Sequence, residues 1–184
     1  MGFVKLLATY LTGGSEKCET PIKRYFIIHT LQPYYLLDNY VPPYNESRCN
    51  DARPRPADTI TAAYLRKYGV LDDLIEYWPN RYGYSNIEKN LEFWRLQWSR
   101  AGMCSPYPLC PDFYFKVAST YVTAIDLLDI LESAGVYPDN GKYEAFLYAN
   151  AIEKALGVNV QIRGNKDAKN VTQFYETIIC ICQS

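Results

Sequence analysis

Segments that alternate apolar and polar residues, as strands do, stand near the two ends of this 184-residue chain, and helical patterns fill the middle. FVKLLATYL and RYFIIHTL, separated by TGGSEKCETP, predict two strands in the first third. VNVQIRG and QFYETIICIC predict two closing strands. Strands at both ends with helices between them favour one α+β domain over residues 1–184, an antiparallel sheet flanked by several helices.

Five helices are expected between the strands. Asp58 can cap DTITAAYLRKYG, which Gly69 closes. Ser85 and Glu88 form a capping box at the start of SNIEKNLEFWRLQWSR. PDFYFKVASTYVTAIDLLDILESAG predicts one long helix with an apolar face, stopped by Gly135. The remaining two are VLDDLIEYW and KYEAFLYANAIEKALG.

Composition narrows the classes of partner. The formal net charge of −1 creates no global field toward nucleic acid or an anionic membrane, so any RNA contact has to be a local site. The chain has no run of 18 consecutive apolar residues, and we expect no membrane span. A single histidine and the absence of a CxxC pair argue against a zinc site, and we expect no metal and no cofactor. The 18 tyrosines are typical of a loop-rich domain and could also line a ligand groove.

Cysteine and asparagine patterns favour a secreted protein, extracellular or vacuolar. The count of six cysteines is even, and sequons for glycosylation begin at Asn45 and Asn170. Cys180 and Cys182 would lie on one face of a strand about 6–7 Å apart, at the limit of disulfide reach, so they are not expected to pair with each other. MGFVKLLATYLTGG is expected to be a first strand rather than a signal peptide, since Lys5 interrupts its short apolar run.

Two segments carry a recognisable pattern. YFIIHTLQP, residues 25–33, holds the lone histidine, His29, and FWRLQWSRAGMCS, residues 93–105, holds two tryptophans, a glycine and a cysteine. Together they resemble the two active-site motifs of the ribonuclease T2 family, which includes the plant S-RNases. The family motifs FTIHGLWP and FWxHEWxKHGTCS are matched at Phe26, Ile28, His29, Leu31 and Pro33, and at Phe93, Trp94, Trp98, Gly102, Cys104 and Ser105.

The resemblance continues in order along the chain. LIEYWPN is similar to the family's YWPN segment. LLDILESAGVYPDNGKY with AIEKALG resembles the part that follows the second motif, and FYETIICIC resembles the last strand. The order of the motifs is more specific than any one of them, and it implies a ribonuclease T2-like fold. The phosphate-binding glycine loop, GxSxG and HExxH are all absent from the sequence.

Departures from the family's second motif bear on activity. In the family, a second-motif histidine takes the proton from the ribose 2′-hydroxyl, and the first-motif histidine protonates the leaving 5′-oxygen. A further histidine, a glutamate and a lysine bind phosphate and stabilise the transition state. At these positions the chain has Ala101 for the base, with Leu96, Gln97 and Arg100 for the other three groups. Only Arg100 keeps the charge, and only His29 keeps proton chemistry.

These replacements predict a pseudoenzyme. A spacing of i, i+1, i+4 and i+5 puts all four on one helix face, toward a substrate. Losing a positioned base costs roughly 10²–10⁴ in rate, and losing a preorganised charge partner costs on the order of 10²–10³ more, although such effects are not additive. In the first motif, Thr30 and Gln32 replace a glycine and a tryptophan and change the pocket.

Several residues keep two interpretations. His29 is either a satisfied core histidine or a remnant general acid facing an inactivated cleft. Arg100 is either a solvated helix residue or a weak phosphate contact. Tyr34 and Tyr35 either stack bases or cap a core edge. Trp94 and Trp98, at helical spacing, are expected in the core.

The resemblance also implies a disulfide between Cys49 and Cys104. In the family, the cysteine that matches Cys180 pairs with one near the GNK segment, where this chain has Arg163. That bridge is therefore expected to be lost. Cys18, Cys110, Cys180 and Cys182 have no partner assigned from the sequence.

The leading functional hypothesis is a non-catalytic ribonuclease T2 homologue that serves as a storage, interaction or RNA-binding protein. Its partner would be RNA or another protein, with no membrane and no metal. The alternative is a weak acid endoribonuclease that cleaves RNA through a 2′,3′-cyclic phosphate with His29 as the remaining acid. A third interpretation is that the resemblance is accidental and the fold is different.

Overall fold

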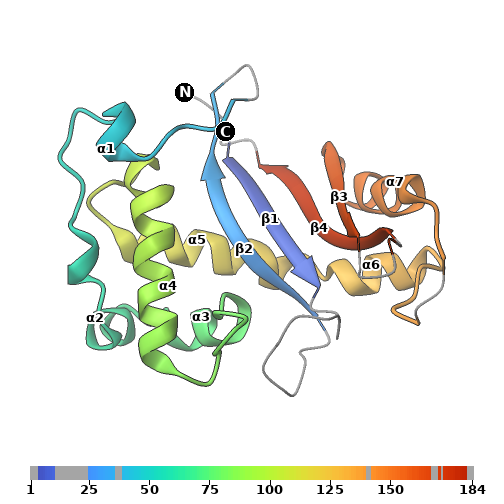
Figure 1. The fold of residues 1–184 in the computed structure, drawn as a ribbon, viewed down its shortest axis with the longest axis horizontal. Helices are drawn as coiled ribbons and strands as arrows, with labels where there is room; N and C mark the ends of the chain where they lie inside the picture. The colour runs from blue at the N-terminus through green and yellow to red at the C-terminus, as the bar shows by residue number, and fades with distance from the viewer. Residues whose placement is uncertain are drawn as a thin grey trace.

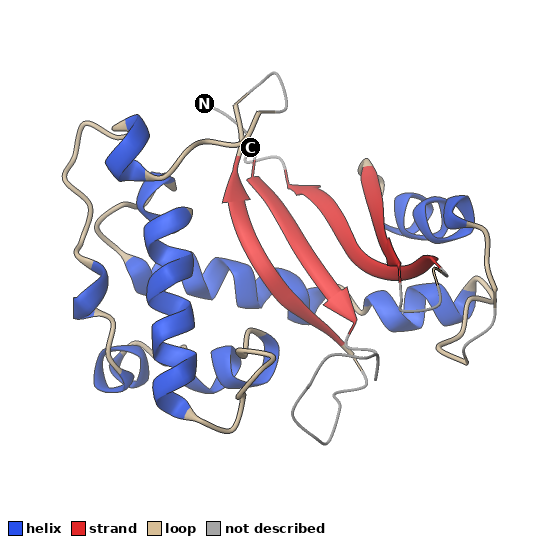
Figure 2. Cartoon of the chain, viewed as in Figure 1, coloured by secondary structure: helices blue, strands red, loops and turns tan. Residues whose placement is uncertain are grey.

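A four-stranded antiparallel sheet organises the molecule (Figures 1 and 2). The computed structural model describes residues 4–10, 25–35, 39–139, 142–166, 170 and 172–181. The strand order is β2-β1-β4-β3, so the two terminal strands along the chain, β1 and β4, are neighbours in the centre. The expected α+β class with an antiparallel sheet is confirmed. The strands are β1 (Val4–Tyr10), β2 (Phe26–Pro33), β3 (Val160–Lys166) and β4 (Thr172–Ile181).

Helices pack behind and beside the sheet. In Figure 1, α5 and α6 run behind it, α4 stands beside the β2 edge, and α7 lies beside β3 at the other edge. Two short 3-10 helices, η1 (Ala57–Thr59) and η2 (Gly102–Cys104), flank the longer ones. The α-helices are α1 (Tyr44–Ser47), α2 (Ala62–Lys67), α3 (Leu71–Tyr77), α4 (Ile87–Arg100), α5 (Pro111–Ala124), α6 (Leu127–Ser133) and α7 (Ala145–Leu156).

Two of the expected helix caps are wrong. Asp58 lies within η1, and α2 begins after Thr61, whose hydroxyl accepts a hydrogen bond from the Tyr64 amide. The cap of α4 is Asn86 rather than Ser85, because the Asn86 side chain accepts from two backbone amides of the first turn. In both places a second polar residue nearby can satisfy the same unpaired amides, and local sequence does not choose between them.

The expected long helix after Cys110 is two helices. α5 ends at Ala124, and α6 begins at Leu127 with the Asp126 carboxylate accepting from the Asp129 amide. An aspartate within a helical segment can either continue the helix or cap the start of a new one, and here Asp126 caps α6. The expected stops are confirmed: Gly69 and Gly135 both have positive φ, of 66° and 79°.

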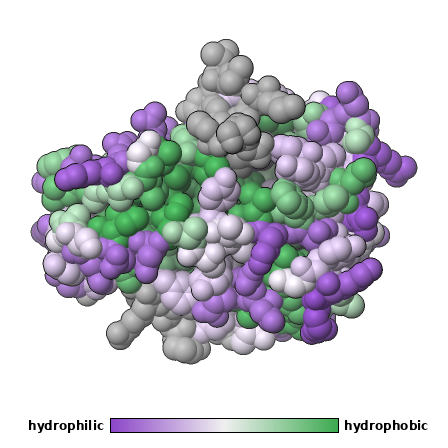
Figure 3. Space-filling model, turned by 180° about the vertical axis from the view of Figure 1, so that it is seen from behind, coloured by the Kyte–Doolittle hydropathy of each residue, from purple (hydrophilic) through white to green (hydrophobic). Residues whose placement is uncertain are grey.

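One face of the sheet is covered by two apolar clusters. Leu6, Ile28 and Leu31 pack with Trp78, which follows α3, and with the tryptophans of α4. Ala8 and Ile179 pack with α6 and α7. Side chains alternate across a strand, so Lys5, Leu7 and Ile178 point to the other face. Viewed from behind, the helical side shows separate apolar patches divided by polar surface (Figure 3).

Candidate functional site

His29 lies at a bulge in β2. Leu7 and Ala8 of β1 are paired with Thr30 and Ile28, and His29 is the extra residue between them. A bulge locally breaks the alternation of a strand and re-aims the side chain it carries. The His29 side chain is 44% exposed, and its Nδ1 hydrogen-bonds Oε1 of Glu176 on β4. Because the side chain is 44% exposed, His29 is not the satisfied core histidine of the first interpretation.

Glu176 joins three strands. Its second carboxylate oxygen, Oε2, accepts a hydrogen bond of 3.3 Å from Nη1 of Arg163 on β3. Arg163 and Glu176 are direct partners in the sheet, whereas His29 reaches across β1 from the opposite edge strand. Glu176 is only 1% exposed, and the side chains of His29 and Arg163 are about half exposed. A buried carboxylate thus sits beneath two solvent-accessible basic side chains.

Sequence reasoning missed Glu176 and assigned Arg163 no role of its own. A signal was present, because Glu176 is the one charged residue in the strand segment QFYETIICIC. Burying a charged side chain in a central strand costs free energy unless the charge is paired and hydrogen-bonded. Which partner it finds depends on strand order, and periodicity does not reveal strand order.

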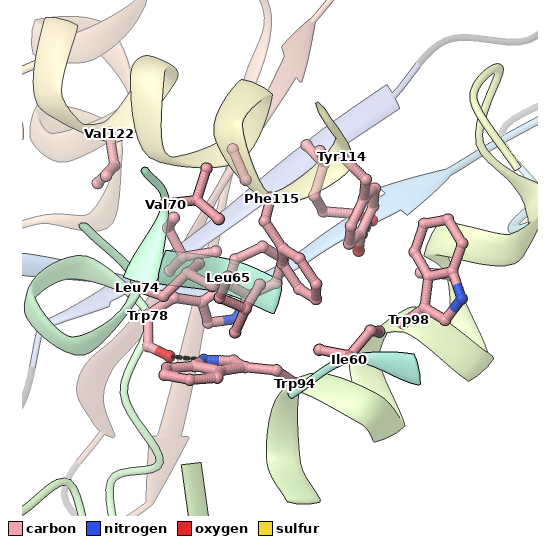
Figure 4. Close-up of a cluster of buried hydrophobic side chains, with 14 of the residues drawn as sticks. Ile60, Leu65, Val70, Leu74, Trp78, Trp94, Trp98, Tyr114, Phe115 and Val122 are labelled. Atoms are coloured by element: carbon pink, nitrogen blue, oxygen red, sulfur yellow. Dashed lines mark hydrogen bonds between the residues drawn. The ribbon is translucent and has the colours of Figure 1, made fainter. Parts of the chain in front are cut away.

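Indole hydrogen bonds connect the two motif segments. Trp78 of the YWPN segment donates from Nε1 to the backbone oxygen of His29 at 3.3 Å. Trp94 on α4 donates from Nε1 to the backbone oxygen of Trp78 at 2.6 Å, and Figure 4 shows this bond inside the cluster. Tyr114 on α5 donates to the backbone oxygen of Leu31 at 2.8 Å. The backbone of β2 is therefore held at His29 by Trp78 and at Leu31 by Tyr114, and Trp94 in turn holds the backbone of Trp78.

The second-motif helix is oriented by buried tryptophans. Trp94 and Trp98 are both 0% exposed, which confirms their expected place in the core. A Cβ on Gly102 would come within 2.2 Å of the Trp98 ring, so this position has no room for a side chain. The glycine of the motif is therefore required by packing.

The four replaced positions do not share one exposed face. Leu96 is 43% exposed and Arg100 is exposed, but Gln97 is 7% exposed and Ala101 is 0% exposed. The prediction that all four meet a substrate is wrong for Gln97 and Ala101. Gln97 lies on the buried side of α4 together with Trp94 and Trp98. Because α4 ends at Arg100, Ala101 does not continue the exposed face and belongs to the core cluster instead.

The expected disulfide is confirmed. Cys49 and Cys104 are bonded, with a Cα–Cα distance of 5.6 Å, and the bond ties the loop after α1 to η2. Asn50 Nδ2 donates to the backbone oxygen of Met103 at 2.6 Å and supports the same junction. The family resemblance thus predicted the one cysteine pair that it assigned.

Of the other four cysteines, the structure describes Cys110 and Cys180. Cys110 is an exposed free thiol. Arg163 stands opposite Glu176, four residues before Cys180 on β4, which is about 13 Å along a strand. A cysteine at position 163 could not reach Cys180 in this register, so the expected reason for a lost bridge is wrong. Cys18 and Cys182 lie outside the described residues.

The remaining candidate residues are placed as follows. Asn45 and Asn170, the sequon asparagines, are both exposed. Gln32 Nε2 donates to the backbone oxygen of Val41 at 3.2 Å, so it braces a loop. The Lys5 ammonium lies 4.4 Å from the ring centre of Tyr34, and Tyr35 is 48% exposed.

Burial raises the pKa of several tyrosines above the usual range, among them Tyr25, Tyr64 and Tyr114. Tyr114 is fully enclosed, and burial is the main cause of its raised pKa. For Tyr25 and Tyr64, burial comes first, and hydrogen bonds to Glu76 and Asp112 raise the pKa further. These phenols stay protonated at physiological pH and act as hydrogen-bond donors.

Two hollows differ in size, and the larger, an open one of about 440 Å³, is lined by Glu153, Gly157, Val158, Asn159 and Cys180. An apolar cavity of about 30 Å³ lies between the ends of the sheet and α5, with Leu31, Tyr114 and Tyr121 in its wall, and it is too small for a nucleotide. Within the described ranges, no group of three or more His, Cys, Asp or Glu side chains could hold a metal ion. In that same part of the chain, no helix has the length and apolarity needed to cross a membrane.

Comparison with known proteins gives a consistent result. A model of the Ribonuclease T2 family matches residues 8–184. Ribonuclease 3 of Arabidopsis thaliana is 29% identical over 85% of this chain and 64% of that protein. A ribonuclease-like storage protein of Panax ginseng is 25% identical over 92% of this chain and 65% of that protein. The chain thus spans a little less than two thirds of the length of these relatives.

Solved structures show the same fold. RNase NT in complex with 5′-AMP has a TM-score of 0.75 and 21% identity, covering 98% of this chain and 85% of that one. Ribonuclease MC1 from the seeds of bitter gourd has a TM-score of 0.78 and 17% identity, covering 98% of this chain and 88% of that one. The expected ribonuclease T2-like fold is therefore confirmed, and an accidental resemblance is ruled out.

Proposed function

Because the chain belongs to the ribonuclease T2 family, we propose that it is a non-catalytic member, a pseudoenzyme, that serves as a storage, interaction or RNA-binding protein. The observation that carries the proposal is the second-motif helix. It presents Leu96 and Arg100 to solvent and buries Gln97 and Ala101, so none of these four positions offers a group that exchanges protons near neutral pH.

The chemistry of RNA cleavage needs two proton transfers. One group removes the 2′-hydroxyl proton and another protonates the leaving 5′-oxygen, and His29 is the single imidazole of the chain. Loss of the base lowers the rate by roughly 10²–10⁴. Loss of a charge partner at phosphorus lowers it by roughly 10²–10³ more, with non-additive effects. Efficient hydrolysis is not compatible with that deficit.

RNA binding is the role that the remaining polar groups suit best. His29 and Arg163 are each about half exposed above a buried carboxylate, and Arg100 is exposed at the end of α4. These groups can contact phosphate and ribose without completing a reaction. The net charge of −1 means that such binding is local and sensitive to salt.

Storage is the competing role, and it draws support from a single comparison. One relative, from Panax ginseng, carries the name ribonuclease-like storage protein. We place the protein in a secreted, extracellular or vacuolar compartment, as a glycoprotein, because Cys49 and Cys104 are bonded and Asn45 and Asn170 are exposed in their sequons.

A second candidate function is a weak acid endoribonuclease. The half-exposed ring of His29, anchored by a carboxylate, favours it, since such a ring can still exchange a proton with a substrate. Cleavage would pass through a 2′,3′-cyclic phosphate, with Arg100 as the electrostatic contact.

The test is cleavage of a fluorogenic RNA by the purified protein from pH 4 to 8, with His29→Ala alongside. Equal background rates support the non-catalytic role, and turnover that collapses in His29→Ala supports the weak enzyme. RNA binding without cleavage, measured at several salt concentrations, separates an RNA-binding protein from a storage protein.

A further inference from the structure

We propose that Glu176 and Arg163 are positioning residues that fix His29 in its Nδ1–H tautomer, which makes Nε2 a hydrogen-bond acceptor for a hydroxyl group such as the ribose 2′-hydroxyl. The choice of ribose as the ligand rests on the proposed RNA-binding function. The tautomer does not depend on that function, because it follows from the three side chains alone.

The tautomer follows from the chemistry of the contact. An ionised carboxylate accepts hydrogen bonds and donates none. The guanidinium of Arg163 has donors and no acceptor, and its Nη1 donates to Oε2 of Glu176. The partner of Oε1, which is Nδ1 of His29, must therefore carry the proton. In a neutral ring the lone pair is then on Nε2.

Burial makes the arrangement rigid. Glu176 is 1% exposed, and a carboxylate at that depth depends on its hydrogen-bond donors. Arg163 approaches from β3 and His29 from β2, so the carboxylate is held from both edges of the sheet. Trp78 holds the backbone of His29 through its carbonyl oxygen. The ring is therefore restrained both at its backbone and at Nδ1.

Exposure determines which side of the ring a ligand meets. Nδ1 is directed to a buried atom, yet 44% of the His29 side chain is exposed. The exposed part of the ring therefore lies away from the Nδ1 contact with Glu176. An Nε2 that carries the lone pair accepts from a hydroxyl, and the 2′-hydroxyl is the group that distinguishes RNA from DNA. This site would thus favour RNA over DNA of the same sequence.

The first measurement uses the fact that the chain has one histidine. In ¹⁵N-labelled protein without a histidine tag, the two imidazole nitrogen signals at neutral to mildly alkaline pH belong to His29 without further assignment. We expect the Nδ1–H tautomer to dominate in the wild type. A wild type in which Nε2–H dominates overturns the proposal, whatever the variants show.

Variants separate positioning from a general structural role. Glu176→Gln removes the anionic acceptor and should shift the ring toward the Nε2–H tautomer that free histidine favours. Arg163→Gln leaves the carboxylate in place and should keep Nδ1–H, which gives a second measurement if Glu176→Gln does not fold. Asp112→Asn is the matched control, because Asp112 also accepts from an aromatic side chain, that of Tyr64, but on α5. A His29 tautomer that changes equally in Asp112→Asn contradicts the proposal.

Binding tests the choice of ligand. A uridine-containing oligoribonucleotide and its 2′-deoxy counterpart are titrated against wild type and Glu176→Gln. We expect the wild type to prefer RNA by roughly two- to tenfold, the worth of one hydrogen bond, and the variant to lose that preference. Equal affinity for both strands in the wild type overturns the ribose assignment. No binding of either strand overturns the proposed RNA-binding function, while the tautomer measurement still decides the role of Glu176.

Discussion

Restoring the four family residues at the second motif would test the proposed loss of catalysis. The variants are Leu96→His, Gln97→Glu, Arg100→Lys and Ala101→His, singly and combined. If the new imidazole at position 101 turns out of the core toward the exposed side of the helix end, the combined protein should cleave RNA roughly 10²–10⁴ times faster than the wild type, since a base then joins the acid already present at His29.

The structure predicts that this restoration destabilises the protein. Ala101 is 0% exposed and belongs to the cluster that contains Trp94 and Trp98, so the larger imidazole ring there should overpack the core. Overpacking of this kind costs about 1–3 kcal/mol. Leu96, 43% exposed, should accept histidine with a change within about 0.5 kcal/mol. Ala101→His should therefore lower the unfolding free energy and Leu96→His should leave it nearly unchanged.

Urea denaturation and a fluorogenic RNA assay measure the two effects separately. Ala101→His with wild-type stability would refute the packing argument, because room for the ring would then exist. A combined variant that folds and cleaves no faster than the wild type would show that the replaced side chains are not what limits activity. Leu96→His is the internal control, since it introduces the same imidazole at an exposed position.

Three further predictions concern stability. Replacing Cys49 and Cys104 together by serine should lower the unfolding free energy by about 4 kcal/mol in chemical denaturation, from the loop entropy of a 55-residue separation; a loss below about 1 kcal/mol would contradict this. Trp94→Phe leaves the buried backbone oxygen of Trp78 without its indole donor and should cost about 1–3 kcal/mol by the same assay. Burial raises the pKa of Tyr114, so its contribution to stability is complete below about pH 10, where free tyrosine ionises, and falls by about 1.4 kcal/mol per pH unit above it. Denaturation of Tyr114→Phe from about pH 9 to 11 should show a correspondingly shallower loss than the wild type.

Local patterns were sufficient for much of the fold. Strand alternation and helical periodicity place β1, β2, β4 and α4 close to their observed bounds, because these signals repeat over many residues. The N-caps of α2 and α4 and the break at Asp126 were not predicted, since several polar residues could serve each helix start and tertiary contacts choose among them.

For the candidate site as well, some features follow from the sequence and others only from the tertiary structure. The sequence by itself determined the family, the identity of His29, the four replaced positions and the Cys49–Cys104 pair, since these depend on which residues occur and in what order. Only the tertiary structure decided that Ala101 is buried and that Glu176 lies between His29 and Arg163. His29 and Glu176 are separated by 147 residues, and they meet because β1 pairs with β2 on one side and with β4 on the other. Strand order and register are properties of the assembled sheet, and no local stretch of sequence encodes them.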